Sequence, residues 1–336
     1  MNIKDIKKRE CFSIAIVGDL IPMLEVRETI IDRRRNDPCR IWGELYHTLQ
    51  KADLIFANFE GIIIQGDEKR KKQWLPPVFS IGIPPAAVSF LTCFDNLLLS
   101  FANNHSADYG REAIEFTMRI LEERQIRYVG MGYNIFEANS PRIITTPFMK
   151  VSFLAFTDLS SEDCYAGENQ SGIAKLTLKN LRNSIGLARQ KSDFTIVYLH
   201  TTGNVKSAPS FFADDHQRFW ARAAVDCGAD MIIGNQSHTV QFIERYKGKL
   251  IFHSLGAFLY DPKLSLMFAP DHPFYGASQI DRGSVLILKI YIGKKIAFDF
   301  YVTRTAYRDG ELAVIHDSLS ARLFARLIKL CANLNY

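Results

Sequence analysis

The chain has 336 residues, of which 47% are hydrophobic and 23% are charged, and its formal net charge is +5. This length and composition indicate a globular protein with one large core or two modest ones. The sequence contains no run of about 18 apolar residues, which excludes a membrane-spanning helix. The first twelve residues lack the apolar segment of a secretory signal, so a cytoplasmic location is expected.

Apolar runs alternate with amphipathic segments along most of the chain, a pattern that predicts strand–helix–strand units and a largely covered sheet. The expected strands cover residues 12–19, 52–60, 96–105, 126–132, 150–157, 193–200, 229–238 and 249–256, and the expected helices cover residues 111–124 and 214–228. Residues 283–315 alternate more strictly and contain a Gly-Lys turn, which favours antiparallel hairpins. A last helix is expected over residues 320–334. No repeat or linker is evident, so a single domain over residues 1–336 is expected.

The six cysteines are scattered, and none forms a C-x-x-C pair. This spacing argues against a zinc ribbon, a redox motif or a disulfide framework, so most of the cysteines are expected to be reduced packing residues. Two short basic clusters, RRR (33–35) and KRKK (69–72), fit solvated loops or an anionic partner.

Several of the expected strands end in side chains that can bind a metal ion or form hydrogen bonds. In an open α/β sheet, ligands collect outside the carboxyl ends of the strands, because neighbouring strands deliver their last side chains to one place. Carboxylate, imidazole and amide donors together suit a hydrolytic site with one or two ions of Mn, Zn or Fe. The strand-end residues are Asp19, Asn58, Glu60, Asn104, His105, His200 and His238.

Each of these residues also has an ordinary structural explanation. Asp19 can cap a turn, and Asn104 can cap a helix or adopt a left-handed conformation. A single histidine is more often a satisfied polar group than a ligand. Their shared position at the ends of successive strands is what favours a common site. His253 lies inside a strand and could line the edge of that site, whereas no role is assigned to the remaining four histidines, His47, His216, His272 and His316.

The most specific motif is ANNHSADYG (102–110), and further motifs are IAIVGD (14–19), ADLIFANFEG (52–61), GADMIIGNQSH (228–238) and IFHSLGAF (251–258). With these motifs, residues 12–285 resemble the bacterial capsule-synthesis protein A family, which is implicated in poly-γ-glutamate synthesis and has the calcineurin-like metallophosphoesterase fold. The resemblance implies a layered α/β-β-α sandwich with mixed sheets and helices on its outer faces. Residues 286–336 would form a C-terminal hairpin and helix.

The resemblance also implies a role for each matching residue. Asp19 and Glu60 would be acidic metal ligands, with Glu60 bridging, and Asn104 would bind through its amide oxygen. His105 would be a histidine that acts on the leaving group without binding metal, and Asp108 would orient its ring. His200 and His238 would complete the metal shell, and Asn58 would support Glu60.

Four departures from the family pattern bear on activity. HTTGN (200–204), which contains Thr201 and Asn204, lacks the tryptophan and the glutamate that the family usually has in this segment. Gln236 stands where an imidazole ligand is expected and Ala257 replaces an asparagine. The membrane anchor typical of the family is not expected in this sequence. A neutral amide binds Zn or Mn more weakly than imidazole does, which leaves open a site with two metals, one or none.

Two functions remain open at this stage. The first is a metal-dependent hydrolase of a phosphoester or a γ-linked amide, whose substrate would be an anionic polymer or a phosphorylated small molecule. The second is a catalytically impaired binding or assembly component of polymer synthesis. Nucleic-acid binding is disfavoured, because no recognition motif accompanies the basic clusters.

Overall fold

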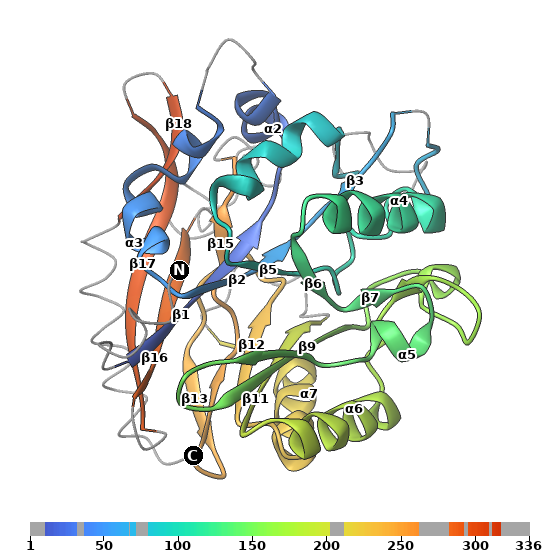
Figure 1. Cartoon of the computed structure of the whole chain (residues 1–336), viewed down its shortest axis with the longest axis vertical. Helices are drawn as coiled ribbons and strands as arrows, with labels where there is room; N and C mark the ends of the chain where they lie inside the picture. Colours follow the sequence, from blue (N-terminus) through green and yellow to red (C-terminus); the bar gives the residue numbers. More distant parts are fainter. Residues whose placement is uncertain are drawn as a thin grey trace.

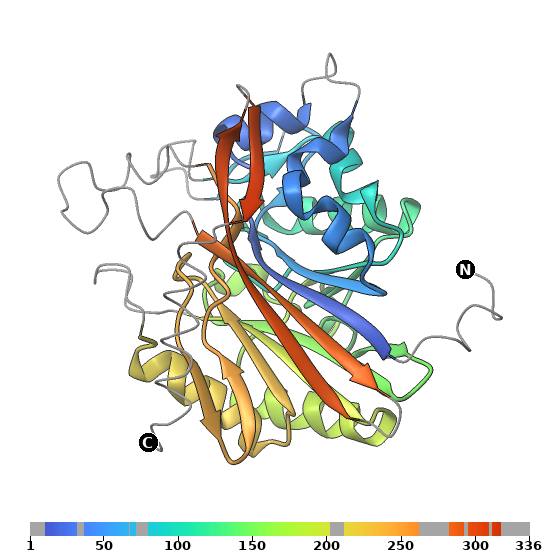
Figure 2. The same ribbon diagram turned by 90° about the vertical axis from the view of Figure 1, so that its left-hand side faces the viewer.

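Two β-sheets face each other at the centre of the molecule, and helices cover the outer face of each sheet (Figure 1). The computed structural model describes residues 11–31, 37–66, 68–71, 80–201, 212–261, 282–291, 295–308 and 311–316. Viewed from the side, the long strands β16 and β17 run diagonally across the molecule (Figure 2). This arrangement confirms the expected α/β class and its layering.

The first sheet has the strand order β18-β17-β16-β1-β2-β5-β6, and β15 pairs with β1 outside this path. Strands β1, β2, β5 and β6 are parallel neighbours, whereas β16 is antiparallel to β1, and β17 and β18 follow it with each strand antiparallel to the one before. The antiparallel tail expected over residues 283–315 is therefore confirmed, and it extends this sheet. The strands are β1 (Cys11–Leu20), β2 (Leu54–Phe59), β5 (Leu97–Ser100), β6 (Arg127–Val129), β15 (Ala257–Leu259), β16 (Arg282–Tyr291), β17 (Ile296–Arg308) and β18 (Glu311–His316).

The second sheet has the strand order β13-β14-β12-β11-β9-β8. Its four inner strands are parallel, and its edge strands β8 and β13 are antiparallel to their neighbours. The strands are β8 (Arg142–Thr145), β9 (Lys150–Thr157), β11 (Phe194–His200), β12 (Met231–Asn235), β13 (Ile243–Tyr246) and β14 (Lys249–Phe252). Two short pairs lie outside both sheets: β3 (Ile62–Ile63) with β4 (Gly82–Ile83), and β7 (Met131–Gly132) with β10 (Gly172–Ile173).

The helices are divided between the two sheets. The first sheet is covered by α2 (Leu24–Ile31), the 3₁₀ helices η1 (Pro38–Leu45) and η3 (Pro85–Cys93), α3 (Tyr46–Gln50) and α4 (Gly110–Glu123). The second sheet is covered by α6 (Leu178–Lys191) and α7 (Asp215–Asp226). The short helices α5 (Ile135–Ala138) and η4 (Glu162–Cys164) lie in the connections.

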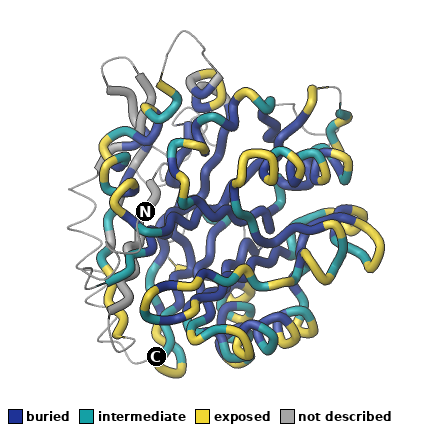
Figure 3. The backbone as a smooth tube through the Cα atoms, in the orientation of Figure 1, coloured by how far each residue is buried: buried dark blue, intermediate teal, exposed yellow. Residues whose placement is uncertain are grey.

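Alternating residues of the second sheet enter two different cores, which explains its continuous apolar runs. In β9, Phe153 packs between the sheets and Leu154 packs beneath the helices; in β11, Tyr198 and Leu199 divide in the same way. The rings of Phe56 in β2 and Phe153 lie 4.9 Å apart between their centroids, which joins the two sheets. Strands buried on both faces are apolar throughout, as the sequence shows. Figure 3 shows this buried interior, with exposed residues mainly in helices and loops.

Several strands are shorter than the sequence suggests. The strand expected over 96–105 ends at Ser100, and the one expected over 229–238 ends at Asn235, so the polar residues that follow lie in loops. The segment 126–132 divides into β6 and β7 at Gly130, whose φ is 86°. A side chain there would place its Cβ 2.7 Å from the Cβ of Ala102. The helix expected over residues 320–334 lies outside the described residues.

The expectation that the cysteines are reduced is wrong for one pair. Cys39 at the start of η1 and Cys93 at the end of η3 form a disulfide, with their Cα atoms 5.6 Å apart. Cys11, Cys164 and Cys227 carry free thiols. The partners are 54 residues apart in sequence, and they meet only because η1 and η3 pack together on the first sheet. Their spacing therefore gave no local signal of the bond.

Candidate metal centre

Asp19 lies at the centre of the site, at the carboxyl end of β1, and is fully buried. Oδ1 of its carboxylate accepts three hydrogen bonds from side chains: from Asn58 Nδ2 at 2.8 Å, Tyr198 Oη at 3.1 Å and Asn235 Nδ2 at 2.6 Å. These donors come from both sheets. They fix the carboxylate so that the other oxygen, Oδ2, points away from them.

Oδ2 of Asp19 faces two further candidate ligands. It lies 3.3 Å from Nδ1 of His238, and that nitrogen lies 3.7 Å from Oε2 of Glu60. The three residues offer ligand atoms that all lie within 4.8 Å of one another. Within the described part of the chain, Asp19 Oδ2 and His238 Nδ1 have no hydrogen-bond partner, although both are buried. Buried polar atoms without partners are costly, so this trio fits a divalent cation.

The charge of Asp19 suits this role. Burial raises the pKa of its carboxyl, but the close approach of His238 and the charges of His200 and His238 outweigh burial and leave the pKa at about 2. Asp19 is therefore ionised at neutral pH. An ionised carboxylate is the form that binds metal.

Glu60 extends the site in a second direction. Its Oε1 atom lies 3.7 Å from Nε2 of His200 and 3.8 Å from Nε2 of His105, whereas its Oε2 faces His238. The carboxylate of Glu60 thus stands between two groups of donors. The bridging position that the resemblance implies for Glu60 is consistent with this geometry.

His200 ends β11 and is fully buried. Its Nε2 lies 2.8 Å from Oδ1 of Asn104, and its Nδ1 lies 3.5 Å from Nδ2 of Asn58. Burial lowers the pKa of His200 to about 4, so the ring is neutral at pH 7. A neutral imidazole is the form that can bind a metal.

His105 is oriented by Asp108. Nδ1 of His105 lies 2.7 Å from Oδ2 of Asp108, and the same oxygen accepts a hydrogen bond of 2.8 Å from the backbone N–H of Ile81. The side chain of His105 is 17% exposed, whereas that of Asp108 is buried. This contact leaves Nε2 of His105 directed at Glu60, the edge where a proton could be transferred.

The loop that carries these residues is shaped by Asn103, a residue that sequence reasoning passed over. Oδ1 of Asn103 accepts hydrogen bonds from the backbone N–H groups of His105 at 3.1 Å and Ser106 at 2.9 Å. Its Nδ2 donates to Oδ1 of Asn58 at 3.1 Å. The turn-forming role considered for Asn104 thus belongs to Asn103, while Asn104 faces His200.

Asn235 and Tyr198 are the other missed residues, since both donate to Asp19. Asn235 also accepts a hydrogen bond of 2.7 Å from the backbone N–H of Leu255, which ties the Asp19 carboxylate to the segment before β15. Its place at the end of β12, beside His200 at the end of β11, was a usable signal. Tyr198 gave no signal, because it lies within an ordinary apolar strand.

The backbone is strained where the second sheet reaches the site. Gln236 has a φ of 107° and His238 has a φ of 51°, in the region that favours glycine. Such conformations cost on the order of 1–3 kcal/mol and cluster at functional sites. Gln236 also directs a buried Oε1 atom that, among the described residues, has no hydrogen-bond partner. Ala257, in β15, pairs with Asp19 and is fully buried.

Not every candidate from the sequence joins the site. The expectation that His253 lines its edge is wrong, because Nε2 of His253 lies 2.8 Å from Oε2 of Glu244, which also pairs with Arg222 of α7 at 2.6 Å. His253 follows the outward-facing Ile251 by two residues, so strand alternation turns it toward the helices. His216 pairs with Asp158 at 2.6 Å on the surface.

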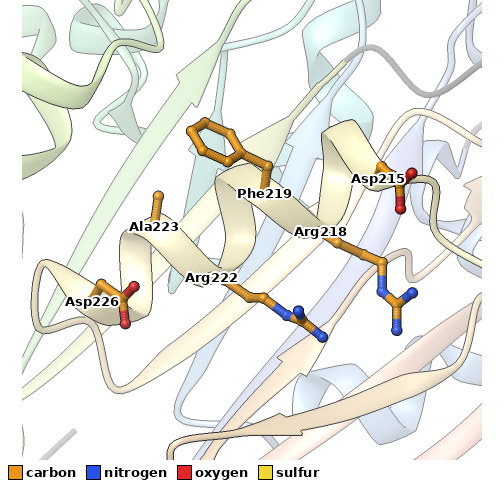
Figure 4. Close-up of a pocket in the computed structure, with 6 residues that line it drawn as sticks. All are labelled: Asp215, Arg218, Phe219, Arg222, Ala223 and Asp226. Atoms are coloured by element: carbon orange, nitrogen blue, oxygen red, sulfur yellow. The ribbon is translucent and has the colours of Figure 1, made fainter. Parts of the chain in front are cut away.

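A surface groove of about 330 Å³ runs along α7 and is separate from the metal centre. Figure 4 shows Arg218 and Arg222 projecting to one side of this helix and Phe219 to the other. None of the candidate ligands lines this groove.

The basic clusters are only partly described. Residues 33–35 and Lys72 lie outside the described residues, as does Asn204. Lys71 forms an ion pair of 2.6 Å with Asp163, and its backbone N–H donates to the carbonyl of Asp108 at 2.7 Å. Lys71 thus supports the His105 loop. Among the residues that the structure describes, no helix has the length and apolar character needed to span a bilayer.

Comparison with known proteins places the chain in a family. Residues 13–262 match the model of the bacterial capsule synthesis protein PGA_cap. The capsule biosynthesis protein CapA of Bacillus anthracis is 27% identical over 76% of this chain and 61% of its own length. The PGA biosynthesis protein CapA of Bacillus subtilis (strain 168) is 27% identical over 75% of this chain and 64% of its own length. The chain thus spans less than two thirds of these relatives.

A solved structure, the NAD nucleotidase NadN of Haemophilus influenzae, is 10% identical to the chain with a TM-score of 0.42, and the match covers 97% of this chain and 61% of that one. The family match, which spans more than half of the chain, confirms the family expected from the motifs. The chain belongs to the bacterial capsule synthesis protein PGA_cap family.

Proposed function

We propose that the chain is a metal-dependent hydrolase that acts on an anionic substrate in the synthesis of a capsule polymer. The observation that carries this proposal is the convergence of Asp19, Glu60 and His238 from both sheets, with two buried ligand atoms that have no hydrogen-bond partner among the described residues. Structural ion pairs satisfy such atoms with hydrogen bonds, whereas a cation satisfies them by coordination.

The remaining residues supply what a hydrolase needs beside the metal. Asp19, Glu60 and His238 would hold a divalent Mn, Zn or Fe ion, which when bound lowers the pKa of water to about 7 and polarises the bond to be cleaved. Asp108 accepts the hydrogen bond from Nδ1 of His105 and so keeps Nε2 available for the leaving group. His200 and Asn104 complete the second group of donors around Glu60.

Two substrate classes fit this machinery: a phosphoester and a γ-linked glutamyl amide. Family membership and the names of the two relatives, which refer to capsule and PGA biosynthesis, support a γ-linked polymer. His105 and the mixed set of carboxylate, amide and imidazole ligands are compatible with cleavage of a phosphoester or of a γ-linked amide.

The test is hydrolysis of a nitrophenyl phosphodiester and of a γ-linked glutamate oligomer by the full chain after treatment with EDTA and after addition of Mn²⁺ or Zn²⁺. We expect the chain to hydrolyse one of the two substrates, and to do so only when metal is present. His105→Ala should lower the turnover rate by about 10²–10⁴-fold. His47→Ala, an exposed histidine outside the site, is the matched control and keeps full activity. Turnover that is unchanged by EDTA, or equal in His105→Ala and the control, contradicts the proposal.

The second candidate is a binding or assembly component that has kept the site without its chemistry. The contact of 2.8 Å between His200 and Asn104 favours it, because these two donors satisfy each other without an ion. The presence of Gln236 and Ala257 at the expected imidazole and asparagine positions supports it too. In that case His105→Ala restores polymer production fully in a deletion strain, whereas the hydrolase requires His105 for production.

A further inference from the structure

We propose that the two halves of the site bind cations with very unequal affinity, and that a second cation is held only when an anion is bound with it. This inference rests on the proposed metal-dependent function. We name the group of Asp19, His238 and Glu60 Oε2 the carboxylate half. We name the group of Asn104, His200, Gln236 and Glu60 Oε1 the amide half, in which the side chain of Gln236 lies beside that of His200.

The carboxylate half has the negative charge and the unpartnered ligand atoms needed to bind a cation by itself. It contains two acidic side chains and one imidazole, and the three ligand atoms lie within 4.8 Å of one another. Three donors on Oδ1 of Asp19 leave Oδ2 directed at His238. Two carboxylates balance the charge of one divalent ion, so this half binds tightly without help from a ligand.

The amide half lacks that charge. Apart from Oε1 of Glu60, 3.7 Å from His200, its donors are a neutral imidazole and two neutral side-chain amides. An imidazole nitrogen suits Zn and Fe better than a neutral amide oxygen does, so Gln236 in an imidazole position weakens the binding of such ions in this half. Oε1 of Gln236 is buried and, among the described residues, lacks a hydrogen-bond partner, as expected of a donor that can turn toward an ion.

Two further features oppose a second cation. His200 and Asn104 are already 2.8 Å apart, so an ion must first break their contact. Glu60 is the only acidic residue in the amide half as defined, and the carboxylate half shares it. A second divalent ion would therefore add two positive charges without any new negative charge, and repulsion between nearby cations is strong in a buried site. An anionic group on the substrate, a phosphate or a carboxylate, supplies the missing charge.

The experiment measures Mn²⁺ binding by the full chain, using equilibrium dialysis for stoichiometry and electron paramagnetic resonance to detect coupling between two Mn²⁺ ions. We expect one Mn²⁺ per chain in buffer alone, and two with the coupled spectrum when an anion is added. Inorganic phosphate and γ-glutamylglutamate, added separately, distinguish a phosphate from a carboxylate as the source of the anion. Neither readout depends on turnover.

Gln236→His is the decisive variant, because it gives the amide half a second imidazole. It should bind two Mn²⁺ ions without an anion, with the second ion held at least about 10-fold more tightly than in the parent. Gln170→His, at an exposed glutamine, is the matched control and should behave like the parent.

Two tightly bound Mn²⁺ ions in the parent without an anion would overturn the inference. Binding of only one Mn²⁺ ion, with no second ion when either anion is added, would also overturn it. Both results leave the hydrolase proposal standing, since an ion still binds. Failure of the folded parent chain to bind any Mn²⁺ or Zn²⁺ instead rejects the metal-dependent function itself, so the two failures are distinguishable. If Gln236→His does not fold, the response of the parent to the two anions still decides the question.

Discussion

Oδ2 of Asp108 joins two parts of the chain, because it lies 2.7 Å from Nδ1 of His105 and accepts a 2.8 Å hydrogen bond from the backbone of Ile81. The carboxylate is buried, so its contact with His105 is shielded from water. The pair therefore sets which nitrogen of His105 faces the metal centre.

We expect Asp108→Asn to lower kcat by about 10–100-fold with little change in KM, because an outer partner orients a reacting group without touching substrate. Steady-state kinetics over a pH series measure this effect. An unchanged kcat with a higher KM would show that Asp108 serves the loop and not the ring.

Asn235→Ala should destabilise the protein by about 1–3 kcal/mol, because it leaves the buried N–H of Leu255 without its partner and removes a donor from Asp19. Urea unfolding of the metal-free chain measures the loss. Asn134→Ala, at the half-buried N-cap of α5, should lower the free energy of unfolding by about 1 kcal/mol and leave metal affinity unchanged. Equal metal affinity in both variants would argue against a role for Asn235 in fixing Asp19.

Stability should fall in acid partly through His253. Burial lowers the pKa of His253 from its ordinary value of 6.5, against the opposing effect of Glu244. The unfolded chain therefore binds a proton at a higher pH than the folded chain, and stability rises with pH in the range just below 6.5. Glu244 acts in the same direction at lower pH, since its pKa is lowered by His253 and Arg222 despite burial.

The measurement is the free energy of unfolding between pH 5 and pH 7.5 without metal. His253→Gln should flatten the dependence below pH 6.5, and His47→Gln, at an exposed position, should not. A dependence that is identical in all three proteins would show that His253 does not titrate on unfolding.

Alkylation under denaturing, non-reducing conditions should leave Cys39 and Cys93 unmodified, because they are paired. Mass spectrometry of the peptides identifies them. Cys39→Ser should lower stability by about 2–4 kcal/mol, whereas Cys227→Ser, at a free thiol, should have little effect. Disulfides persist under oxidising conditions, so the bond should survive purification without reductant. Alkylation of both Cys39 and Cys93 after such a purification would contradict the pairing.

The strands and several residues of the candidate site could be predicted from the sequence because both have local signals. Apolar runs located β1, β2, β9 and β11 within one or two residues, and polar residues after these runs located Asp19, Glu60 and His200. The loops were harder, since the turns at Gly130 and Asn103 depend on contacts with residues distant in the sequence. Tyr198 and the Cys39–Cys93 bond could not be predicted from local sequence. The partner of Tyr198 is defined by the packing of the two sheets, and the disulfide is defined by the packing of η1 against η3.

The backbone crossing at Gly18 and Gly256 governs when the site can form during synthesis. The N–H of Asp19 donates to the carbonyl of Gly256 at 2.9 Å, and a Cβ at Gly18 would collide with that carbonyl. Residues from opposite ends of the family region must therefore meet before Asp19 is in place, and such distant contacts form slowly. A nascent chain that stops before residue 256 can pair β1 with β2, but it cannot hold Asp19 in its final position. The ribosome must therefore release nearly all of this region before the site can bind a ligand.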